Sequence, residues 1–255
     1  MNIALFGGTF DPIHSGHVWA ARAATHRFRL SRVLFVPSGN PPHKYRNRLT
    51  PFAHRFAMVA LACATDRRFV PSLLEAPRAD GQPHFSIDTV RAVKRSLGAR
   101  DQLFFLLGAD AFLDLPHWKE YRRLLATVNI IIVSRPGFSN QELGQVVPGG
   151  LIRPRAEGGL LDTVDLKHTT LHVLRGVDVP VASRDIREAI RAERRVTGLV
   201  PRLVEQYILK EGLYRPARTG PHDDDSTPAA GRGGCPGSQG PGVGGPRPER
   251  HLFVY

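Results

Sequence analysis

The sequence predicts an α/β protein with a Rossmann-like, doubly wound, mostly parallel sheet that carries helices on both faces. Two observations support this class. Apolar runs without regular polar alternation recur through the first 134 residues, as expected for strands that are covered on both faces. Longer helical patterns separate these runs, so successive strands are joined by helices and run in the same direction.

The expected strands of the amino-terminal half are residues 3–6, 33–37, 69–74, 103–107 and 129–134. The helices between them are predicted at residues 15–28, 51–64, 87–97 and 110–125. Thr50-Pro51 favours a helix start, because a capping hydroxyl precedes proline at the first helical position. Further along, the pattern predicts strands at 171–174 and 179–182 and helices at 183–194 and 201–210. Residues 137–168 are Gly-rich and polar, and no element is assigned to them.

The end of the chain has a different composition. Residues 216–255 contain nine Gly and seven Pro. Such a segment buries too little apolar area to offset its ordering entropy, so we expect a disordered Gly/Pro-rich tail. The sequence therefore predicts one folded domain at residues 1–215 followed by this tail.

The composition is ordinary for a soluble globular protein, with 42% hydrophobic and 23% charged residues. No apolar run approaches the ~18 residues of a membrane helix, and no basic segment with a long apolar stretch opens the chain, so neither a membrane partner nor a signal peptide is expected. The two cysteines, Cys63 and Cys235, lie in a helical pattern and in the tail. A disulfide is therefore not expected, and a reducing cytoplasm fits.

The formal net charge of +12 lies in residues 1–215, because four arginines and four acidic residues balance within the tail. This excess favours an anionic ligand such as nucleotide phosphates or nucleic acid. The alternative is solvated surface arginine, since Arg outnumbers Lys 30 to 5. A basic nucleic-acid-binding protein is the rival class. The chain has no RNA- or DNA-binding motif and few aromatic residues near its basic stretches, so no nucleic acid partner is expected.

The stretch GGTFDPIHSGH, residues 7–17, joins the first predicted strand to the first predicted helix. Ligands of open α/β sheets bind at the carboxyl ends of strands, and a helix N-terminus offers free N–H groups to phosphate. Gly7 and Gly8 allow the backbone to turn sharply and to approach a ligand closely. His14 and His17 are three residues apart, so they share one face of the opening helical turn.

This stretch matches neither the dinucleotide-binding G-x-G-x-x-G pattern nor the G-x-x-x-x-G-K-[ST] phosphate loop. Redox cofactors and ordinary kinase chemistry are therefore disfavoured. A zinc site is one alternative for the two histidines, but it needs a third and usually a fourth ligand, and no partnering His/Cys cluster accompanies them. Two unrelated surface histidines are the other alternative.

The eleven residues resemble the His-x-Gly-His motif of nucleotidylyltransferases, and in full they resemble the bacterial nicotinate-nucleotide adenylyltransferase family. Other segments resemble that family in order along residues 2–214: VPSGNPPHK at 36–44, HFSIDTV at 84–90, LLGADAFLDLPHW at 106–118, VSRPG at 133–137 and YILKEGLY at 207–214. Where the family carries Ile-Ser-Ser-Thr-x-Ile-Arg, this chain reads VASRDIR at 181–187. Ala182 and Arg184 thus replace two hydroxyl donors, and Arg184 can offer charged donors instead.

The resemblance implies adenylyl transfer from ATP to nicotinate mononucleotide, which gives nicotinate adenine dinucleotide and pyrophosphate. Mg²⁺ would accompany ATP rather than occupy a protein cage. On the ATP side, the resemblance implies that His14 and His17 hold phosphates, with His17 at the α-phosphate. The other implied ATP-side residues are Gly7, Gly8, Thr9 and Phe10 through their backbone, Gly108 and Asp110 near the ribose, Ser183 as a helix cap, and Arg187 at the β/γ-phosphates.

The implied acceptor side consists of Asn40, Lys44, Ser86, Trp118 and Arg135. Trp118 is either a stacking platform for the pyridine ring or a core tryptophan. Ser86 either donates to the ring carboxylate or caps a helix. Lys44 and Arg135 either attract the anionic groups of the mononucleotide or stay solvated.

The nearest rival function is that of a phosphopantetheine or other adenylyltransferase with the same histidine motif. The block from Asp110 to Trp118 and the chain length favour the pyridine nucleotide. The sequence leaves open the preference for the acid or the amide mononucleotide, the oligomeric state, and the role of Arg55. His54, its neighbour, is expected to be structural.

Overall fold

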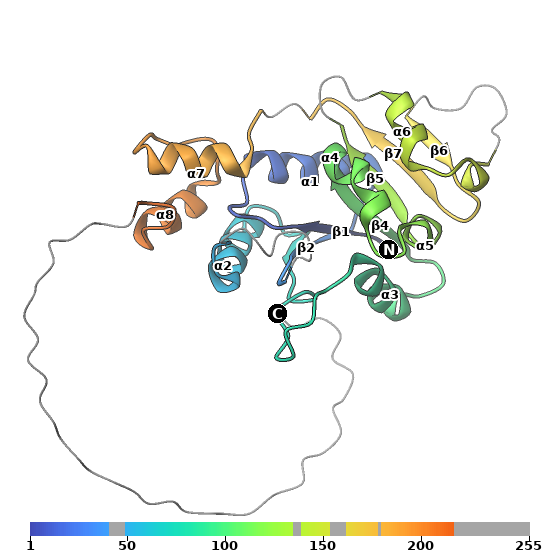
Figure 1. Ribbon diagram of the computed structural model, residues 1–255, viewed down its shortest axis with the longest axis horizontal. Coiled ribbons are helices and arrows are strands. Elements are labelled where there is room, and N and C mark those ends of the chain that lie inside the picture. Colours follow the sequence, from blue (N-terminus) through green and yellow to red (C-terminus); the bar gives the residue numbers. More distant parts are fainter. Residues whose placement is uncertain (41–48, 135–138, 154–161, 178–179, 217–255) are drawn as a thin grey trace, which may run out of the picture. The chain divides into compact units, whose positions relative to one another are not determined.

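A seven-stranded sheet is the scaffold of the folded domain (Figure 1). The computed structural model describes residues 1–40, 49–134, 139–153, 162–177 and 180–216. The strands are β1 Asn2–Gly8, β2 Arg32–Pro37, β3 Phe69–Pro71, β4 Gln102–Gly108, β5 Asn129–Val133, β6 Thr163–Asp165 and β7 Thr170–Leu174. Their order is β3-β2-β1-β4-β5-β7-β6, and every pair is parallel except β6 with β7. The predicted α/β class with a mostly parallel, doubly wound sheet is confirmed.

Helices cover both faces of this sheet. They are α1 Ser15–Phe28, α2 Phe52–Cys63, α3 Ser86–Ser96, α4 Ala109–Leu113, α5 Tyr121–Thr127, α6 Asn140–Val146, α7 Ser183–Arg191 and α8 Arg202–Lys210, with 3₁₀ turns at Leu115–His117 (η1) and Gly149–Leu151 (η2). Successive side chains of β1 point to opposite faces. Ala4 and Phe6 belong to a core with α1, α2, α7 and α8, whereas Ile3 and Leu5 belong to a core with α3, α4, α5 and α6.

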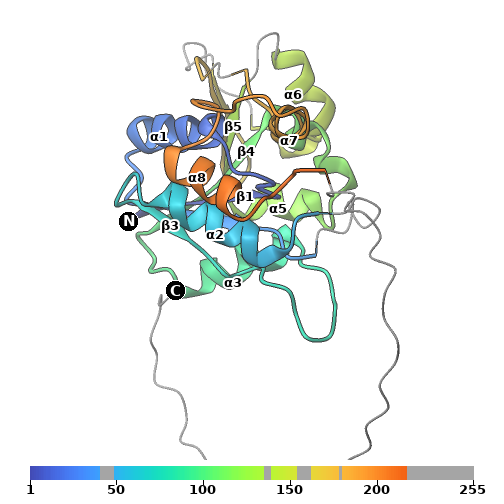
Figure 2. The ribbon, with the colours of Figure 1, turned by 90° about the vertical axis from the view of Figure 1, so that its left-hand side faces the viewer.

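Small side chains bring α1 close to the sheet, because its buried face includes Ala20, Ala21 and Ala24. On the same side, α8 lies beside α2, as Figure 2 shows. The Nδ1 atom of His54 on α2 is 2.8 Å from the hydroxyl oxygen of Tyr207 on α8. The expectation that His54 is structural is consistent with this contact between two helices.

Several predicted elements are wrong in extent. The helix predicted at 110–125 is three pieces, α4, η1 and α5, because Pro116 lies at the start of the 3₁₀ turn and Glu120 has a left-handed φ of 51°. The strand predicted at 69–74 ends at Pro71. The sequence also predicts a strand at 179–182, but its described residues, 180–182, belong to no strand of the sheet. The unassigned stretch 137–168 contributes α6 and the antiparallel strand β6.

Two strands reach further than the sequence predicts, and this brings glycines to one edge of the sheet. β1 runs to Gly8 and β4 to Gly108. Gly8 pairs with Pro37 of β2, and Gly108 pairs with Val133 of β5. The carboxyl ends of four neighbouring strands therefore meet at the edge where ligands of such sheets bind.

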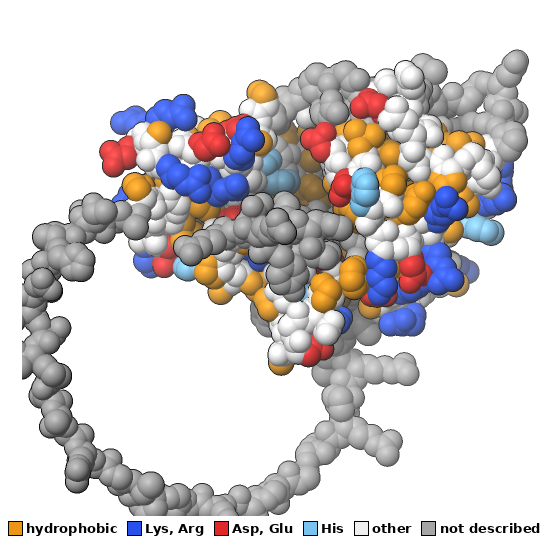
Figure 3. Space-filling view, viewed as in Figure 1, with side chains coloured by type: hydrophobic (Ala, Val, Ile, Leu, Met, Phe, Trp, Pro, Cys, Tyr) orange, Lys and Arg blue, Asp and Glu red, His pale blue; other side chains and the backbone are white. Residues whose placement is uncertain are grey.

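No helix among the described residues is long and apolar enough to cross a membrane. On the face seen in Figure 3, Lys and Arg side chains form several separate groups with Asp and Glu among them. This distribution matches the solvated-surface interpretation of the positive charge on that face. The predicted tail lies outside the described residues, apart from Pro216, and stays a prediction.

The turn after β2 requires glycine at position 39. A Cβ atom at Gly39 would overlap the carbonyl oxygen of Glu75 and lie 2.8 Å from the nitrogen of Pro77. Because backbone atoms cannot move aside as a flexible side chain can, we expect Gly39→Ala to lower the free energy of unfolding by about 1–3 kcal/mol. Urea denaturation followed by circular dichroism measures this change.

Gly144→Ala in α6 is the matched control. A Cβ atom at Gly144 has no neighbour within 4 Å. Alanine is the better helix former, so this variant should gain about 0.5–1 kcal/mol. Equal stabilities of the two variants would contradict the packing argument.

Candidate active site

The segment of residues 7–17, called the histidine loop below, leaves β1 at Gly8 and enters α1 at His14, its N-cap residue. The His17 side chain folds back to this cap: its Nδ1 atom accepts a hydrogen bond from the His14 amide N–H at 3.2 Å. The two imidazole rings are stacked, with centroids 3.7 Å apart and an interplanar angle of 29°. The predicted common face of the two histidines is confirmed. Since Nδ1 of His17 is an acceptor, its ring proton lies on Nε2.

Both imidazoles are removed from water, and this sets their charge. Burial lowers the pKa of His14 to about 4, with Asp185 acting in the opposite direction. Burial also lowers the pKa of His17 well below 6.5, and the neighbouring His14 adds to this effect. Within the described residues, the buried Nδ1 atom of His14 has no hydrogen-bond partner. Buried polar atoms without partners are rare and concentrate at functional sites.

Glycines in the histidine loop make room for aromatic rings. Phe10 has a left-handed φ of 49° and is buried, and its ring meets His17 edge-on with centroids 5.0 Å apart. A Cβ atom at Gly8 would lie 2.9 Å from the Phe10 ring, and one at Gly16 would lie 3.1 Å from Nδ1 of His14. The loop therefore requires small residues beside both rings.

Helix α7 is tied to the histidine loop through two carbonyl groups. The Ser183 hydroxyl donates to the carbonyl of Pro12 at 2.9 Å, and the Arg187 guanidinium donates to the carbonyl of Asp11 at 2.6 Å. The prediction that Ser183 caps the helix is wrong, because Ala182 occupies the N-cap position and Ser183 is the first helical residue. Arg184 points to solvent with 76% of its side chain exposed, beside Glu188. Its expected role as a charged donor to the triphosphate stays a prediction.

A cavity of about 410 Å³ opens at the carboxyl ends of β1 and β4. Seven residues of the predicted site line it: Gly7, Gly8, Thr9, Ser86, Gly108, Asp110 and Trp118. Its other lining residues include Ser38, Glu75, Phe85, Phe105 and Lys119. The tertiary structure thus brings together the ends of two strands, the start of α3 and the turn after α4.

The side chains expected on the acceptor side have different surroundings. Trp118 is half-buried, its ring stands perpendicular to Phe105 with centroids 6.3 Å apart, and its indole N–H donates to Asp114 at 3.2 Å. Ser86 is the first residue of α3, and Phe85 is the N-cap, so the capping alternative for Ser86 is wrong. Asn40 is not among the cavity residues and donates to the carbonyl of Gly81 at 3.4 Å instead.

Lys44 and Arg135 lie outside the described residues, so their expected roles stay predictions. Three residues near the site were not predicted from the sequence. Lys119 lines the cavity, with its ammonium group 4.3 Å from the centre of the Phe85 ring. Asp11 and Arg55 are buried beside the histidine loop. Asp11 lies inside the stretch of residues 7–17, so the sequence motif could have indicated it. The contacts of Arg55 could not be read from a motif, because they join separate segments of the sequence.

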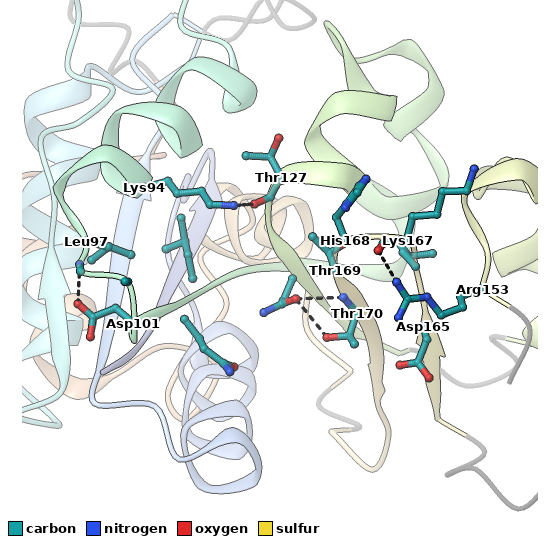
Figure 4. A pocket seen from close by; sticks show the side chains of 16 residues that line it. Lys94, Leu97, Asp101, Thr127, Arg153, Asp165, Lys167, His168, Thr169 and Thr170 are labelled. Atoms are coloured by element: carbon teal, nitrogen blue, oxygen red, sulfur yellow. Dashed lines mark hydrogen bonds between the residues drawn. The ribbon is translucent and has the colours of Figure 1, made fainter. Parts of the chain in front are cut away.

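A larger cavity of about 860 Å³ lies at the opposite edge of the sheet, at the amino ends of β4, β5 and β7 (Figure 4). Lys94 donates there to the carbonyl of Thr127 at 2.5 Å, and Arg153 donates to the carbonyl of Lys167 at 2.8 Å. Lys94 therefore joins α3 to the end of α5, and Arg153 joins the segment after η2 to the turn between β6 and β7. The smaller cavity is the better candidate site. It lies at the carboxyl ends of the parallel strands, and the two histidines lie at the same end of the sheet.

The fold and the histidine-bearing turn from strand to helix define a nucleotidyltransferase, and the Cytidylyltransferase-like family model matches residues 5–191. A probable nicotinate-nucleotide adenylyltransferase of Thermus thermophilus is 40% identical over 216 residues, which are 84% of this chain and 100% of that protein. Another, from Desulfotalea psychrophila, is 36% identical over 218 residues, 83% of this chain and 99% of that protein. The chain belongs to the nicotinate-nucleotide adenylyltransferase family.

A solved structure with a similar fold is Plasmodium falciparum nicotinic acid mononucleotide adenylyltransferase complexed with NaAD. Its TM-score is 0.61 at 18% sequence identity, and the match covers 84% of this chain and 97% of that one. At this identity the likeness concerns the fold alone.

The lowered pKa values of the two histidines predict a loss of stability in acid. Between pH 6.5 and the folded-state pKa of His14, about 4, the unfolded chain binds a proton that the folded chain does not. Unfolding free energy therefore falls as the pH drops through this window. Between pH 7 and pH 5, His14 alone should lower the free energy of unfolding by about 2 kcal/mol, and His17 should lower it further.

Denaturant titrations at pH 7 and pH 5 measure this change. The variants His14→Gln and His17→Gln should each lose less stability on acidification than the wild type. His26→Gln, at an exposed position of the same helix, is the control and should keep the wild-type difference. Identical pH dependence in all four proteins would contradict the assignment.

Proposed function

We propose that this chain transfers the adenylyl group of ATP to nicotinate mononucleotide, forming nicotinate adenine dinucleotide and releasing pyrophosphate. The observation that carries the proposal is the pair of stacked, desolvated imidazoles at the N-terminus of α1, at the same sheet edge as the cavity lined by Trp118 and Ser86. Membership of the adenylyltransferase family supports the same reaction.

The reaction is an in-line displacement at phosphorus. A phosphate oxygen of the mononucleotide forms a bond to the α-phosphorus of ATP. The bond from that phosphorus to the oxygen bridging to the β-phosphate breaks, and pyrophosphate leaves with the electron pair. The nucleophile is already an anion, so no side chain has to remove a proton, and catalysis consists of positioning and charge stabilisation.

His17 is suited to stabilise the negative charge that develops at the α-phosphoryl group. Its Nδ1 atom is held by the His14 amide, which leaves the Nε2–H group as a donor of defined direction. A neutral, desolvated imidazole donates without the reorganisation that water requires. His14, stacked on it, would contact the other phosphates.

The remaining ATP-side roles are those that the family resemblance implies. The backbone of Gly7, Gly8, Thr9 and Phe10 would approach the nucleotide, and Gly108 with Asp110 would accept the ribose hydroxyls at the end of β4. One nitrogen of Arg187 is bound to the Asp11 carbonyl, and its other N–H groups would reach the β/γ-phosphates. Ser183 would act indirectly, since its hydroxyl holds the Pro12 carbonyl.

On the acceptor side, Trp118 would stack on the pyridine ring and the Ser86 hydroxyl would donate to the ring carboxylate. Lys119 lines the same cavity and forms an ion pair with Asp88 at 3.1 Å, so its charge is already partly balanced. Lys44, Arg135 and Asn40 stay predicted contributors. Nicotinate rather than nicotinamide mononucleotide is the proposed substrate because the similar relatives are probable nicotinate-nucleotide adenylyltransferases.

Mg²⁺ stays a prediction as a companion of ATP. Among the described residues, no group of three or more His, Cys, Asp or Glu side chains is arranged to hold a metal ion. When bound together with ATP, the ion would supply charge neutralisation at the phosphates. A cytoplasmic location likewise stays a prediction from the cysteine usage.

Pyrophosphate release from ATP tests the proposed function. The wild-type protein should release pyrophosphate with nicotinate mononucleotide, more slowly with the amide, and not with phosphopantetheine. His17→Ala removes one donor to the developing charge, so kcat should fall about 10²–10³-fold. His26→Ala, exposed on the same helix, is the control and should keep wild-type kcat. Release with phosphopantetheine alone would overturn the proposal.

Trp118→Ala tests the stacking platform. Loss of one aromatic stacking partner should raise KM for the mononucleotide about 10-fold or more, because such contacts contribute ~1–3 kcal/mol. KM for ATP should change much less. Trp19→Ala is the matched control, since Trp19 is 55% exposed on α1. Equal effects on both substrates would show that Trp118 supports the fold instead.

A further inference from the structure

Arg55 is a charged residue whose burial needs an explanation. It lies in the first turns of α2, and only 2% of its surface is exposed. Its Nε–H group donates to the carbonyl of Thr50 at 2.9 Å. Its Nη1 atom donates to two further carbonyls, those of Thr9 and Ser38, each at 2.8 Å. One guanidinium thus joins the end of β1, the end of β2 and the entry to α2.

The charge of Arg55 is balanced inside the protein by Asp11. This carboxylate is buried, and it accepts hydrogen bonds from the Thr50 amide N–H at 3.2 Å and from the Tyr214 hydroxyl at 2.7 Å. Burial lowers the pKa of Arg55, and the nearby Asp11 counteracts the shift. A buried cation is tolerated when a counter-charge and acceptors lie nearby, and this network supplies Asp11 and three carbonyl oxygens.

The carbonyl contacts have a consequence on the other side of each peptide. In a planar trans peptide the carbonyl and the following N–H point in opposite directions. When Arg55 holds the Thr9 carbonyl, the amide N–H of Phe10 is turned away from the guanidinium. When it holds the Ser38 carbonyl, the amide N–H of Gly39 is turned away in the same manner. No hydrogen bond between described residues uses the N–H of Phe10 or of Gly39.

We propose that Arg55 is a positioning residue for adenylyl transfer, which holds the Thr9 and Ser38 carbonyls and so presents the amide N–H groups of Phe10 and Gly39 as phosphate donors. The inference rests on the proposed function. Thr9 and Ser38 both line the cavity of the candidate site, and Phe10 and Gly39 follow them directly in the chain. Donors aimed before the substrate arrives need no reorganisation during the reaction.

Arg55→Lys is the principal test. Lysine keeps the positive charge but lacks the planar fork that reaches three carbonyls at once. We expect kcat to fall about 10²-fold, with KM for nicotinate mononucleotide unchanged within about threefold. Arg68→Lys is the matched control, because Arg68 also makes two close contacts through its fork, to Asp66 at 2.9 and 2.7 Å, in the loop after α2. It should keep wild-type kcat.

A second readout is independent of turnover. In ¹H–¹⁵N spectra of the full chain, the amide signals of Phe10 and Gly39 should shift downfield when ATP alone is added to the wild type and to Arg68→Lys. In Arg55→Lys these shifts should be lost. Should Arg55→Lys not fold, Tyr214→Phe removes one donor to Asp11 and should reduce kcat and both shifts in the same direction.

The two readouts separate this inference from the proposed function. A wild type that transfers no adenylyl group, but whose amide signals respond to ATP only with Arg55 intact, would refute the function and keep the positioning role. Unchanged kcat and unchanged amide responses in folded Arg55→Lys would overturn the positioning role. A loss of kcat that stabilising osmolytes restore would also overturn it, because Arg55 would then serve the fold alone.

Discussion

The peptide groups between β1 and α1 belong to no strand or helix, and their need for hydrogen-bond partners organises the candidate site. Buried backbone groups must be satisfied, and here distant side chains do it. Arg55 holds the Thr9 carbonyl, Arg187 the Asp11 carbonyl and Ser183 the Pro12 carbonyl. The histidine loop is thus fixed from α2 on one side and from α7 on the other.

These hydrogen bonds hold the histidine loop in place, and this explains how two imidazoles can be stacked and buried at the start of a helix. The His14 amide holds the His17 ring, and the buried ring of Phe10 meets His17 edge-on. Desolvation keeps both rings neutral near pH 7 and makes each N–H group a strong donor to an incoming anion. A rigid, neutral donor pair suits the displacement of pyrophosphate, in which the protein stabilises charge but removes no proton.

The overall positive charge has less to do with the site than the sequence alone suggested. Most cations with described partners make surface ion pairs or hold carbonyl groups, as Arg68, Arg91 and Lys94 do. Arg55 and Arg187 are cations that contact the histidine loop through side-chain hydrogen bonds to its carbonyls. The net charge of the chain therefore indicated an anionic ligand, but it did not identify the residues that would bind that ligand.

The sequence by itself determined the α/β class, the parallel strands and the stretch at residues 7–17, because hydrophobic periodicity and a local motif are read from neighbouring residues. It also named seven residues that share one cavity. Tertiary structure alone decided the roles of Asp11 and Arg55, whereas the break of the helix predicted at 110–125 near Pro116 and the pairing of β6 with β7 are local features. The contacts of these two residues join segments far apart in the sequence, such as Asp11 with Tyr214 and Arg55 with Thr9. A pattern along one chain cannot carry that information, because a buried arginine and a surface arginine look alike until the fold brings their partners together.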